Sequence, residues 1–132
     1  MVVTLSKQDM KERTRKFALR VIKLSTALPQ TAAGRVIANQ LVRCGTSVGA
    51  NYRAALRARS TPDFISKLGI TLEEADESVY WIELIIEGGL VRAERAGDLL
   101  KEANELTAIF AASHRTTKAH SMRNAREANH KS

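Results

Sequence analysis

The sequence predicts an all-α protein that folds as an up-and-down antiparallel four-helix bundle. Two observations support this prediction: apolar residues recur at intervals of three and four along most of the chain, and only two prolines and seven glycines interrupt it. With 132 residues, 44% of them hydrophobic, the chain can form one domain with its own core. We expect the bundle at residues 1–113 and a basic, weakly helical or disordered tail at 114–132.

The first helix is expected to begin after Ser6. Asp9 follows three residues later, which is typical of a capping box, with Asp in place of the usual Glu. Pro29 marks the end of the helix, because the residue before a proline is pushed out of the α region. The buried stripe of this helix consists of Phe17, Val21, Leu24 and Leu28.

The second helix is expected to run from a cap at Thr31 to about Arg59. Small residues separate its apolar positions, so neighbouring helices can approach it closely. A membrane span is excluded, because only nine uncharged residues separate Arg43 from Arg53 where about 20 apolar residues would be required. The inward positions are Ile37, Leu41, Cys44, Val48, Asn51 and Ala55.

The third and fourth helices follow from equally local signals. Ser60, Pro62 and Asp63 supply a cap, a first-turn proline and an early acid, and Gly88 and Gly89 end the third helix. The fourth segment carries a shorter apolar stripe, and short loops favour antiparallel neighbours. Across the bundle, the predicted core includes Phe17, Val21, Leu41, Val48, Leu68, Leu72, Val79, Ile82, Leu99 and Leu106.

Charge divides the chain into three parts. Residues 1–60 hold 12 Lys and Arg against two acids (+10), residues 61–113 hold four against eleven (−7), and residues 114–132 hold five against one (+4). Apolar residues almost disappear after Ser113, which is why a tail is expected there. The basic part favours an acidic partner such as nucleic acid, and the opposed halves favour helix pairing within the chain or head-to-tail contacts between copies.

The two central helices resemble those of a known family. They contain QLVRCGTSVGANYRAA at 40–55 and FISKLGITLEEADESVYWIELI at 64–85, which are similar to the four-helix-bundle protein encoded in intervening sequences of bacterial 23S rRNA genes. The resemblance covers roughly residues 10–112. One departure is that Ala54 and Ala55 stand where the family usually has an acid followed by alanine, so any ion pair that this acid makes in relatives is lost here.

The resemblance implies a bundle that assembles into a ring, commonly of five subunits, and that has no enzyme activity. A related group, the accessory variability proteins of diversity-generating retroelements, has a similar bundle and ring and binds nucleic acid and a reverse transcriptase. By this resemblance, the expected partners are a second copy of the chain in a homopentamer, RNA or DNA, and a reverse transcriptase.

Polar residues of the second and third helices are expected to meet. Ser47 and Asn51 lie one turn apart, and Glu74 and Glu77 lie on the facing acidic helix. We favour a buried hydrogen-bond network that fixes helix register over a polar binding site, because buried polar groups must find partners. No nucleophile, base and orienting residue form a catalytic set in the sequence, and the Glu-x-x-His pairs of metal-binding bundles are absent, so no enzyme activity, cofactor or metal is expected.

The cysteine and the histidines are not expected to form a site. Cys44 falls on an inward helix face, which favours a structural thiol in a reducing compartment and so a cytoplasmic protein. His114, His120 and His130 lie in the tail, six and ten residues apart, which favours solvated side chains over metal ligands.

Two classes of function remain open. The first is a nucleic-acid-binding oligomeric accessory protein that recognises backbone and shape, and the second is a protein-binding scaffold with no nucleic-acid role. In addition to the basic tail, the candidate phosphate-binding residues are Lys11, Arg13, Arg15, Lys16, Arg20, Lys23, Arg53, Arg57 and Arg59.

Overall fold

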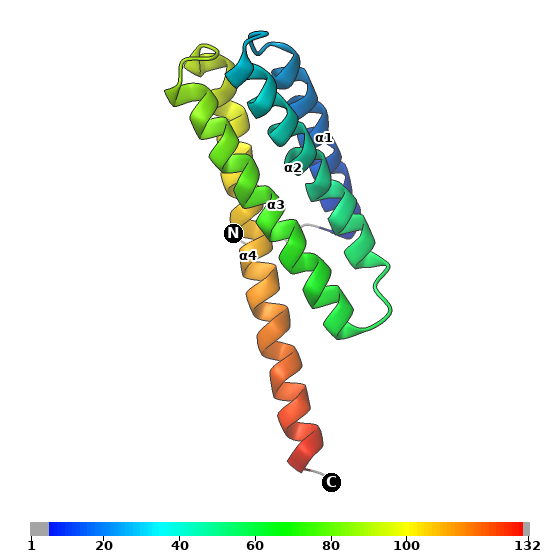
Figure 1. Ribbon diagram of the computed structural model, residues 1–132. Helices are drawn as coiled ribbons and strands as arrows, with labels where there is room; N and C mark the ends of the chain where they lie inside the picture. The colour runs from blue at the N-terminus through cyan, green and yellow to red at the C-terminus, as the bar shows by residue number, and fades with distance from the viewer. Residues whose placement is uncertain (1–5, 131–132) are drawn as a thin grey trace.

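The computed structural model describes residues 6–130 and contains four α-helices: α1 (Lys7–Thr26), α2 (Ala32–Leu56), α3 (Thr61–Glu87) and α4 (Ala93–His130). Consecutive helices run in opposite directions and are joined by short turns (Figure 1). No strand occurs among the described residues, and the predicted all-α four-helix bundle is confirmed. Residues 1–5 of the predicted bundle domain and residues 131–132 of the predicted tail lie outside the described part.

The helix ends follow the predicted capping signals. Ser6 and Asp9 form a reciprocal capping box, Thr31 accepts a hydrogen bond from the Gly34 amide, and Ser60 accepts one from the Asp63 amide. α2 ends at Leu56, slightly before the expected end near Arg59. After α3, Gly89 adopts a left-handed conformation with a φ of 67°, which glycine accepts without steric cost and which turns the chain into α4.

The core is the one that the apolar stripes predict. Of the ten predicted core residues, Leu72 is half-buried and the other nine are buried. α1 lies close against α2 because glycines leave room for it: a Cβ atom at Gly45 would stand 2.8 Å from both methyl groups of Val21, and one at Gly49 would stand 3.2 Å from the Thr14 hydroxyl. α2 also packs on α3, and α3 on α4, whereas the contact between α1 and α4 is the sparsest.

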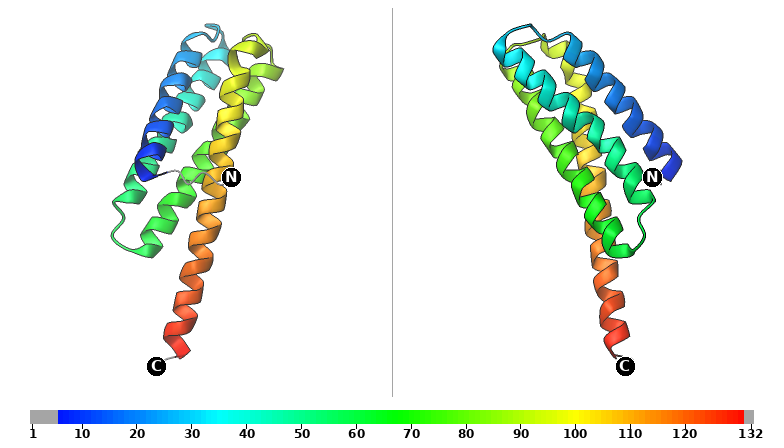
Figure 2. Two further views of the ribbon diagram at one scale, coloured as in Figure 1. Left: turned by 180° about the vertical axis from the view of Figure 1, so that it is seen from behind. Right: turned by 45° about the vertical axis from the view of Figure 1, so that its right-hand side comes forward.

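The last helix is longer than expected. Phe110 is the last buried residue of α4, yet the helix continues to His130 and projects beyond the end of the bundle at which α2 turns into α3 (Figures 1 and 2). Residues 114–130 of α4, here called the projection, therefore differ from the weakly helical or disordered tail that was expected. The physical reason is local: the projection contains no proline or glycine and is rich in Ala, Arg and other residues that favour helices without burial.

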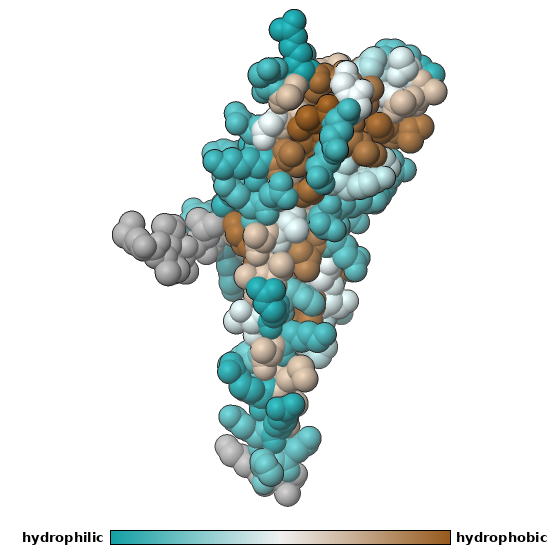
Figure 3. All heavy atoms as spheres, turned by 90° about the vertical axis from the view of Figure 1, so that its left-hand side faces the viewer, coloured by the Kyte–Doolittle hydropathy of each residue, from teal (hydrophilic) through white to brown (hydrophobic). Residues whose placement is uncertain are grey.

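The surface differs between the bundle and the projection. Hydrophobic residues gather over the bundle, while the projection is mostly hydrophilic (Figure 3). None of the described helices is both long enough and apolar enough to cross a membrane. The large hydrophobic side chains that are exposed are Leu19, Ile22, Val36, Ile70, Tyr80 and Met122.

Candidate nucleic-acid interface

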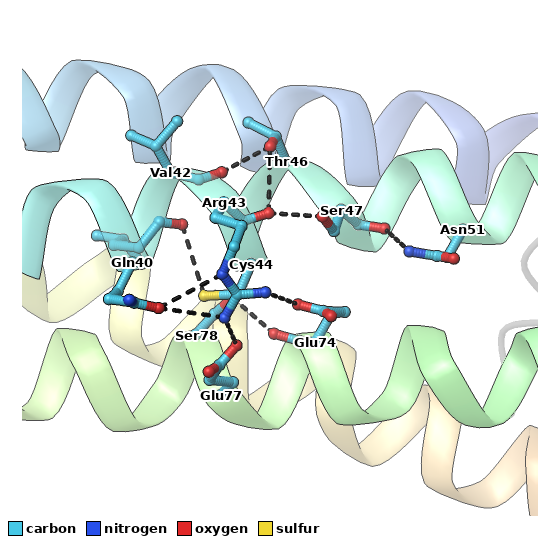
Figure 4. A network of polar contacts seen from close by, with 11 residues as sticks. Gln40, Val42, Arg43, Cys44, Thr46, Ser47, Asn51, Glu74, Glu77 and Ser78 are labelled. Carbon is cyan, nitrogen blue, oxygen red and sulfur yellow. Dashed lines mark hydrogen bonds and ion pairs between the residues drawn. The ribbon is translucent and has the colours of Figure 1, made fainter.

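A polar network joins α2 to α3, and Arg43 is at its centre (Figure 4). The Arg43 guanidinium lies 2.5 Å from a carboxylate oxygen of Glu77 and 3.5 Å from one of Glu74. It also donates to the side-chain oxygen of Gln40, at 3.3 Å. Charge-assisted contacts of this kind set which turn of α2 faces which turn of α3.

Ser47 and Asn51 belong to the same chain of contacts but bond to the α2 backbone. The Ser47 hydroxyl donates to the carbonyl oxygen of Arg43 at 2.6 Å, and the Asn51 amide donates to the carbonyl oxygen of Ser47 at 2.8 Å. The predicted contacts of Ser47 and Asn51 with Glu74 and Glu77 are not formed, and Arg43 is instead the residue of α2 that contacts both acids. The sequence offered a signal for this, because Arg43 precedes Ser47 by one helical turn and so shares its flank of α2.

Burial of Glu74 affects its ionisation. Desolvation raises the pKa of Glu74, and the positive charge of Arg43 opposes that shift. One carboxylate oxygen of Glu74 is buried and makes no hydrogen bond, although Arg43 is within ion-pair distance of it. Glu77 takes the shorter contact with Arg43, which leaves Glu74 the less well satisfied of the two acids.

Arg13 has a structural role that the sequence pattern did not reveal. Its guanidinium donates twice to Glu102, at 2.8 and 2.7 Å, and once to Glu105 at 2.8 Å, and so connects α1 to α4. The hydrogen bond from Arg13 lowers the pKa of Glu102. Because these contacts occupy the fork of the guanidinium, Arg13 is a poor candidate for binding phosphate.

The other candidate cations are mostly unpaired. Arg15 lies 3.4 Å from Glu12 on an exposed face, a contact of little energetic weight. Within residues 6–130, the remaining seven candidates make no ion pair with a carboxylate: Lys11, Lys16, Arg20, Lys23, Arg53, Arg57 and Arg59.

Five of these seven unpaired cations fall into two groups, while Lys11 and Lys16 lie in the N-terminal half of α1. Arg53, Arg57 and Arg59 lie at the last turn of α2 and in the turn to α3, the end of the bundle beyond which α4 projects (Figure 1). Arg20 and Lys23 lie near the C-terminal end of α1, at the opposite end of the bundle. The structure thus does not unite the candidates in one surface.

The projection adds cations at the first of these two ends. It carries four Lys or Arg residues and a single acid, Glu127, on a helix whose side chains are mostly exposed. Together with Arg53, Arg57 and Arg59, these four form what we call the basic end of the molecule. The cations of the projection are Arg115, Lys118, Arg123 and Arg126.

Metal-ligating side chains do not cluster in the part of the chain that the structure describes, where no three His, Cys, Asp or Glu residues could hold an ion. His114, His120 and His130 are spread along the projection, and His120 lies 3.3 Å from the Asn124 amide. Cys44 is free and buried, and burial raises the pKa of its thiol. Its sulfur accepts a hydrogen bond from the Ser78 hydroxyl at 3.3 Å.

Comparison with known proteins identifies relatives of the bundle. The family model described as "23S rRNA-intervening sequence protein" matches residues 6–112. A similar solved structure is the crystal structure of a protein of unknown function from the S23 ribosomal protein family of Bacteroides thetaiotaomicron VPI-5482. It is 35% identical, with a TM-score of 0.73, over 79% of this chain and 96% of that chain. No curated protein matches the sequence. The family match ends at residue 112, so the projection lies outside it.

Proposed function

Because the chain belongs to the 23S rRNA-intervening sequence protein family, we propose that it is a non-enzymatic accessory protein that binds the backbone of RNA or DNA. The basic end is the binding surface in this proposal. The family name refers to 23S rRNA, which makes RNA the first polyanion to test.

The observation that supports the proposal is that seven cations without ion-pair partners gather at the basic end. Arg13 and Arg43 link neighbouring helices, and each is held by two glutamates. In contrast, none of the seven cations of the basic end lies within ion-pair distance of an acid in residues 6–130. Exposed Lys and Arg side chains that gather at one end of a molecule without ion-pair partners are the electrostatic footprint of a phosphate-binding surface.

Binding at this surface would read backbone and shape. Tyr80 is the large aromatic side chain that is exposed in the described part, and it lies on α3 among acids. Stacking on bases therefore contributes little, and phosphate contacts supply most of the affinity. A site with six such contacts would lose on the order of a thousandfold in affinity to duplex DNA between 50 and 200 mM salt.

The proposal includes the partners that the family resemblance implies. The protein would act as a homo-oligomer, a pentameric ring, so that the basic end is repeated and weak contacts become avid. A reverse transcriptase is a further candidate partner by the same resemblance. A cytoplasmic location fits the free, buried thiol of Cys44, which needs no disulfide partner.

A protein-binding scaffold without a nucleic-acid role is the alternative. Leu19 and Ile22 of α1 favour it, because both are exposed one helical turn apart and could dock an apolar partner surface. The two proposals differ in whether polyanions bind, which one titration decides.

The experiment measures binding of structured RNA and of duplex DNA by fluorescence anisotropy at about 50 and 200 mM salt. The test variant carries Arg53→Gln, Arg57→Gln and Arg59→Gln. The control variant carries Arg35→Gln, Arg92→Gln and Lys101→Gln, which remove the same charge from exposed positions away from the basic end. We expect the test variant to bind more weakly, with a salt slope reduced by about 0.9 per lost contact on duplex DNA, and the control to bind nearly as wild type does.

Two results would contradict the proposal. If the wild type binds neither polyanion at the lower salt, the scaffold alternative replaces it. If both variants lose affinity equally, net charge rather than the basic end determines binding.

A further inference from the structure

A second cationic feature lies at the other end of the bundle, between α1 and α4, whose contact is the sparsest of the four helix contacts. A cavity of about 330 Å³ opens there and is lined by Arg20, Lys23 and Leu24 of α1 and by Arg95 and Leu99 of α4. Its volume is at the lower end of the range in which proteins bind small molecules.

The chemistry of the lining divides into two parts. Leu24 and Leu99 are buried and form an apolar floor, while Arg20, Lys23 and Arg95 are exposed and bring three positive charges to the rim. Two guanidinium groups can each donate in pairs to phosphate oxygens, and a lysine adds a point charge. The apolar floor suits the sugar or base that a phosphate carries.

No carboxylate of residues 6–130 forms an ion pair with the three rim cations. Glu102 is the carboxylate that Arg20 influences, but Arg13 holds Glu102 by two hydrogen bonds and also binds Glu105. Glu94 and Asp98 are exposed on α4, one residue before and three residues after Arg95, but neither forms an ion pair with it. The three rim cations therefore have no ion-pair partner among residues 6–130, and they lie beside the first two turns of α4, where the helix dipole also favours an anion.

From this geometry we propose that the α1–α4 cavity binds the phosphate group of a nucleotide. The group can come from a free mononucleotide or from the 5′ end of a nucleic-acid strand, because both present a terminal phosphate joined to a sugar. This inference extends the proposed function to a second site, remote from the basic end. It explains why Arg20 and Lys23 do not join the other unpaired cations: they serve an end phosphate, whereas the basic end serves the continuous backbone.

The test uses the full-length protein and four probes: inorganic phosphate, adenosine 5′-monophosphate, and one RNA oligonucleotide with either a 5′-phosphate or a 5′-hydroxyl end. The cavity variant carries Arg20→Gln, Lys23→Gln and Arg95→Gln. The control variant carries Lys7→Gln, Arg35→Gln and Lys101→Gln, which remove the same charge from exposed positions outside the cavity lining. Calorimetric titration and circular dichroism of each variant give affinity and folding.

We expect adenosine 5′-monophosphate to bind more tightly than inorganic phosphate, and the cavity variant to weaken that binding by about tenfold or more while the control does not. Preference for the 5′-phosphate end in the oligonucleotide pair identifies a strand end as the ligand. If the mononucleotide binds but the oligonucleotide with the 5′-phosphate is not preferred, the ligand is a free nucleotide. Binding that is the same in wild type and cavity variant, or no binding of any phosphate probe, overturns the inference.

The outcomes separate this inference from the proposed function. If long RNA binds and the Arg53, Arg57 and Arg59 substitutions weaken it while the cavity variant binds as wild type does, only the cavity assignment fails. If the mononucleotide binds in the cavity and long RNA and DNA do not bind, only the proposed function fails.

Discussion

Single residues in this bundle act mainly through how closely they let helices approach. Gly45 is the sharpest case, because a Cβ atom there would lie 2.8 Å from the two methyl groups of Val21 and 3.1 Å from its Cβ. Val21 is β-branched and has little rotameric freedom with which to move away. Gly97, by contrast, is also helical but has no atom within 4 Å of the position a Cβ would take.

Substituting alanine for each of these two glycines should change the stability of the fold in opposite directions. Gly45→Ala should lower the free energy of unfolding by roughly 1–2 kcal/mol, because overpacking outweighs the gain in helix propensity. Gly97→Ala should raise it by about 0.5–1 kcal/mol, because only the propensity gain applies. Urea unfolding of the two variants beside the wild type measures both changes. A stabilised Gly45→Ala variant would show that α1 and α2 are not in close contact in solution.

Glu74 gives a prediction that depends on pH. Burial raises its folded-state pKa, so its contribution to stability is fully present below the unfolded pKa and is lost as the pH rises through the folded value. Because glutamine does not ionise, the Glu74→Gln variant does not lose this stability. Its free energy of unfolding relative to that of the wild type should therefore rise between about pH 4 and pH 7. Urea midpoints at several pH values test this, with Glu73→Gln as the exposed neighbouring control. A stability difference that stays constant over this range would contradict it.

At the scale of helices, sequence patterns correctly predicted the helix ends, which depend on residues close together in the chain. The capping residues Ser6, Thr31 and Ser60 and the turn at Gly89 placed the ends of three helices closely, because each signal acts within a few residues. The length of α4 was missed for the opposite reason. The projection buries almost no apolar side chain, so the periodicity that marks the other helices is absent there.

The candidate site could be predicted less well than the fold. Whether a cation is free depends on which helix faces it, and sequence spacing does not contain that information. Arg13 looks like the other basic residues of α1, yet it is bound by Glu102 and Glu105, which lie about ninety residues further along the chain. The cavity also depends on tertiary structure, since Arg95 reaches Arg20 and Lys23 only in the folded bundle.

Arg13 makes the sparse α1–α4 contact sensitive to acid. Because its hydrogen bond lowers the folded-state pKa of Glu102, the pair stabilises the fold above the unfolded pKa and loses this effect as the pH falls through the folded value. Arg13→Gln should therefore cost about 1 kcal/mol at pH 7 and much less near pH 3. Arg15→Gln, which alters only an exposed contact with Glu12, is the control and should cost little at either pH. Urea unfolding at both pH values measures the effect, and an equal cost of Arg13→Gln at both would exclude Glu102 as the relevant partner.

At the scale of the whole molecule, the exposed apolar residues sit among charges of opposite sign on different helices. Leu19 and Ile22 of α1 share a helix face with Arg15, which precedes Leu19 by one turn. On α3, Ile70 and Tyr80 flank the acidic middle of the helix. One such face on a subunit can pack against the other face on its neighbour, and a contact of this heterologous kind, repeated by rotation, closes a ring.

The last prediction is therefore a homo-oligomer that depends on both charge and apolar contact. Sedimentation at low salt should give a mass several times the 14.6 kDa of one chain, and five times that mass if the ring size implied by the family resemblance holds. Leu19→Ser with Ile22→Ser should shift the mass toward a single chain at micromolar concentration, because the contact loses its apolar centre. Val36→Ser, which changes an exposed apolar residue on α2, should not shift the mass.

Raising the salt should also weaken the assembly, since charges at the rim of the contact are screened over about 10 Å at 0.1 M. A wild type that sediments as one chain at low salt would rule out the ring, and the basic end would then have to bind nucleic acid without the avidity that repetition provides.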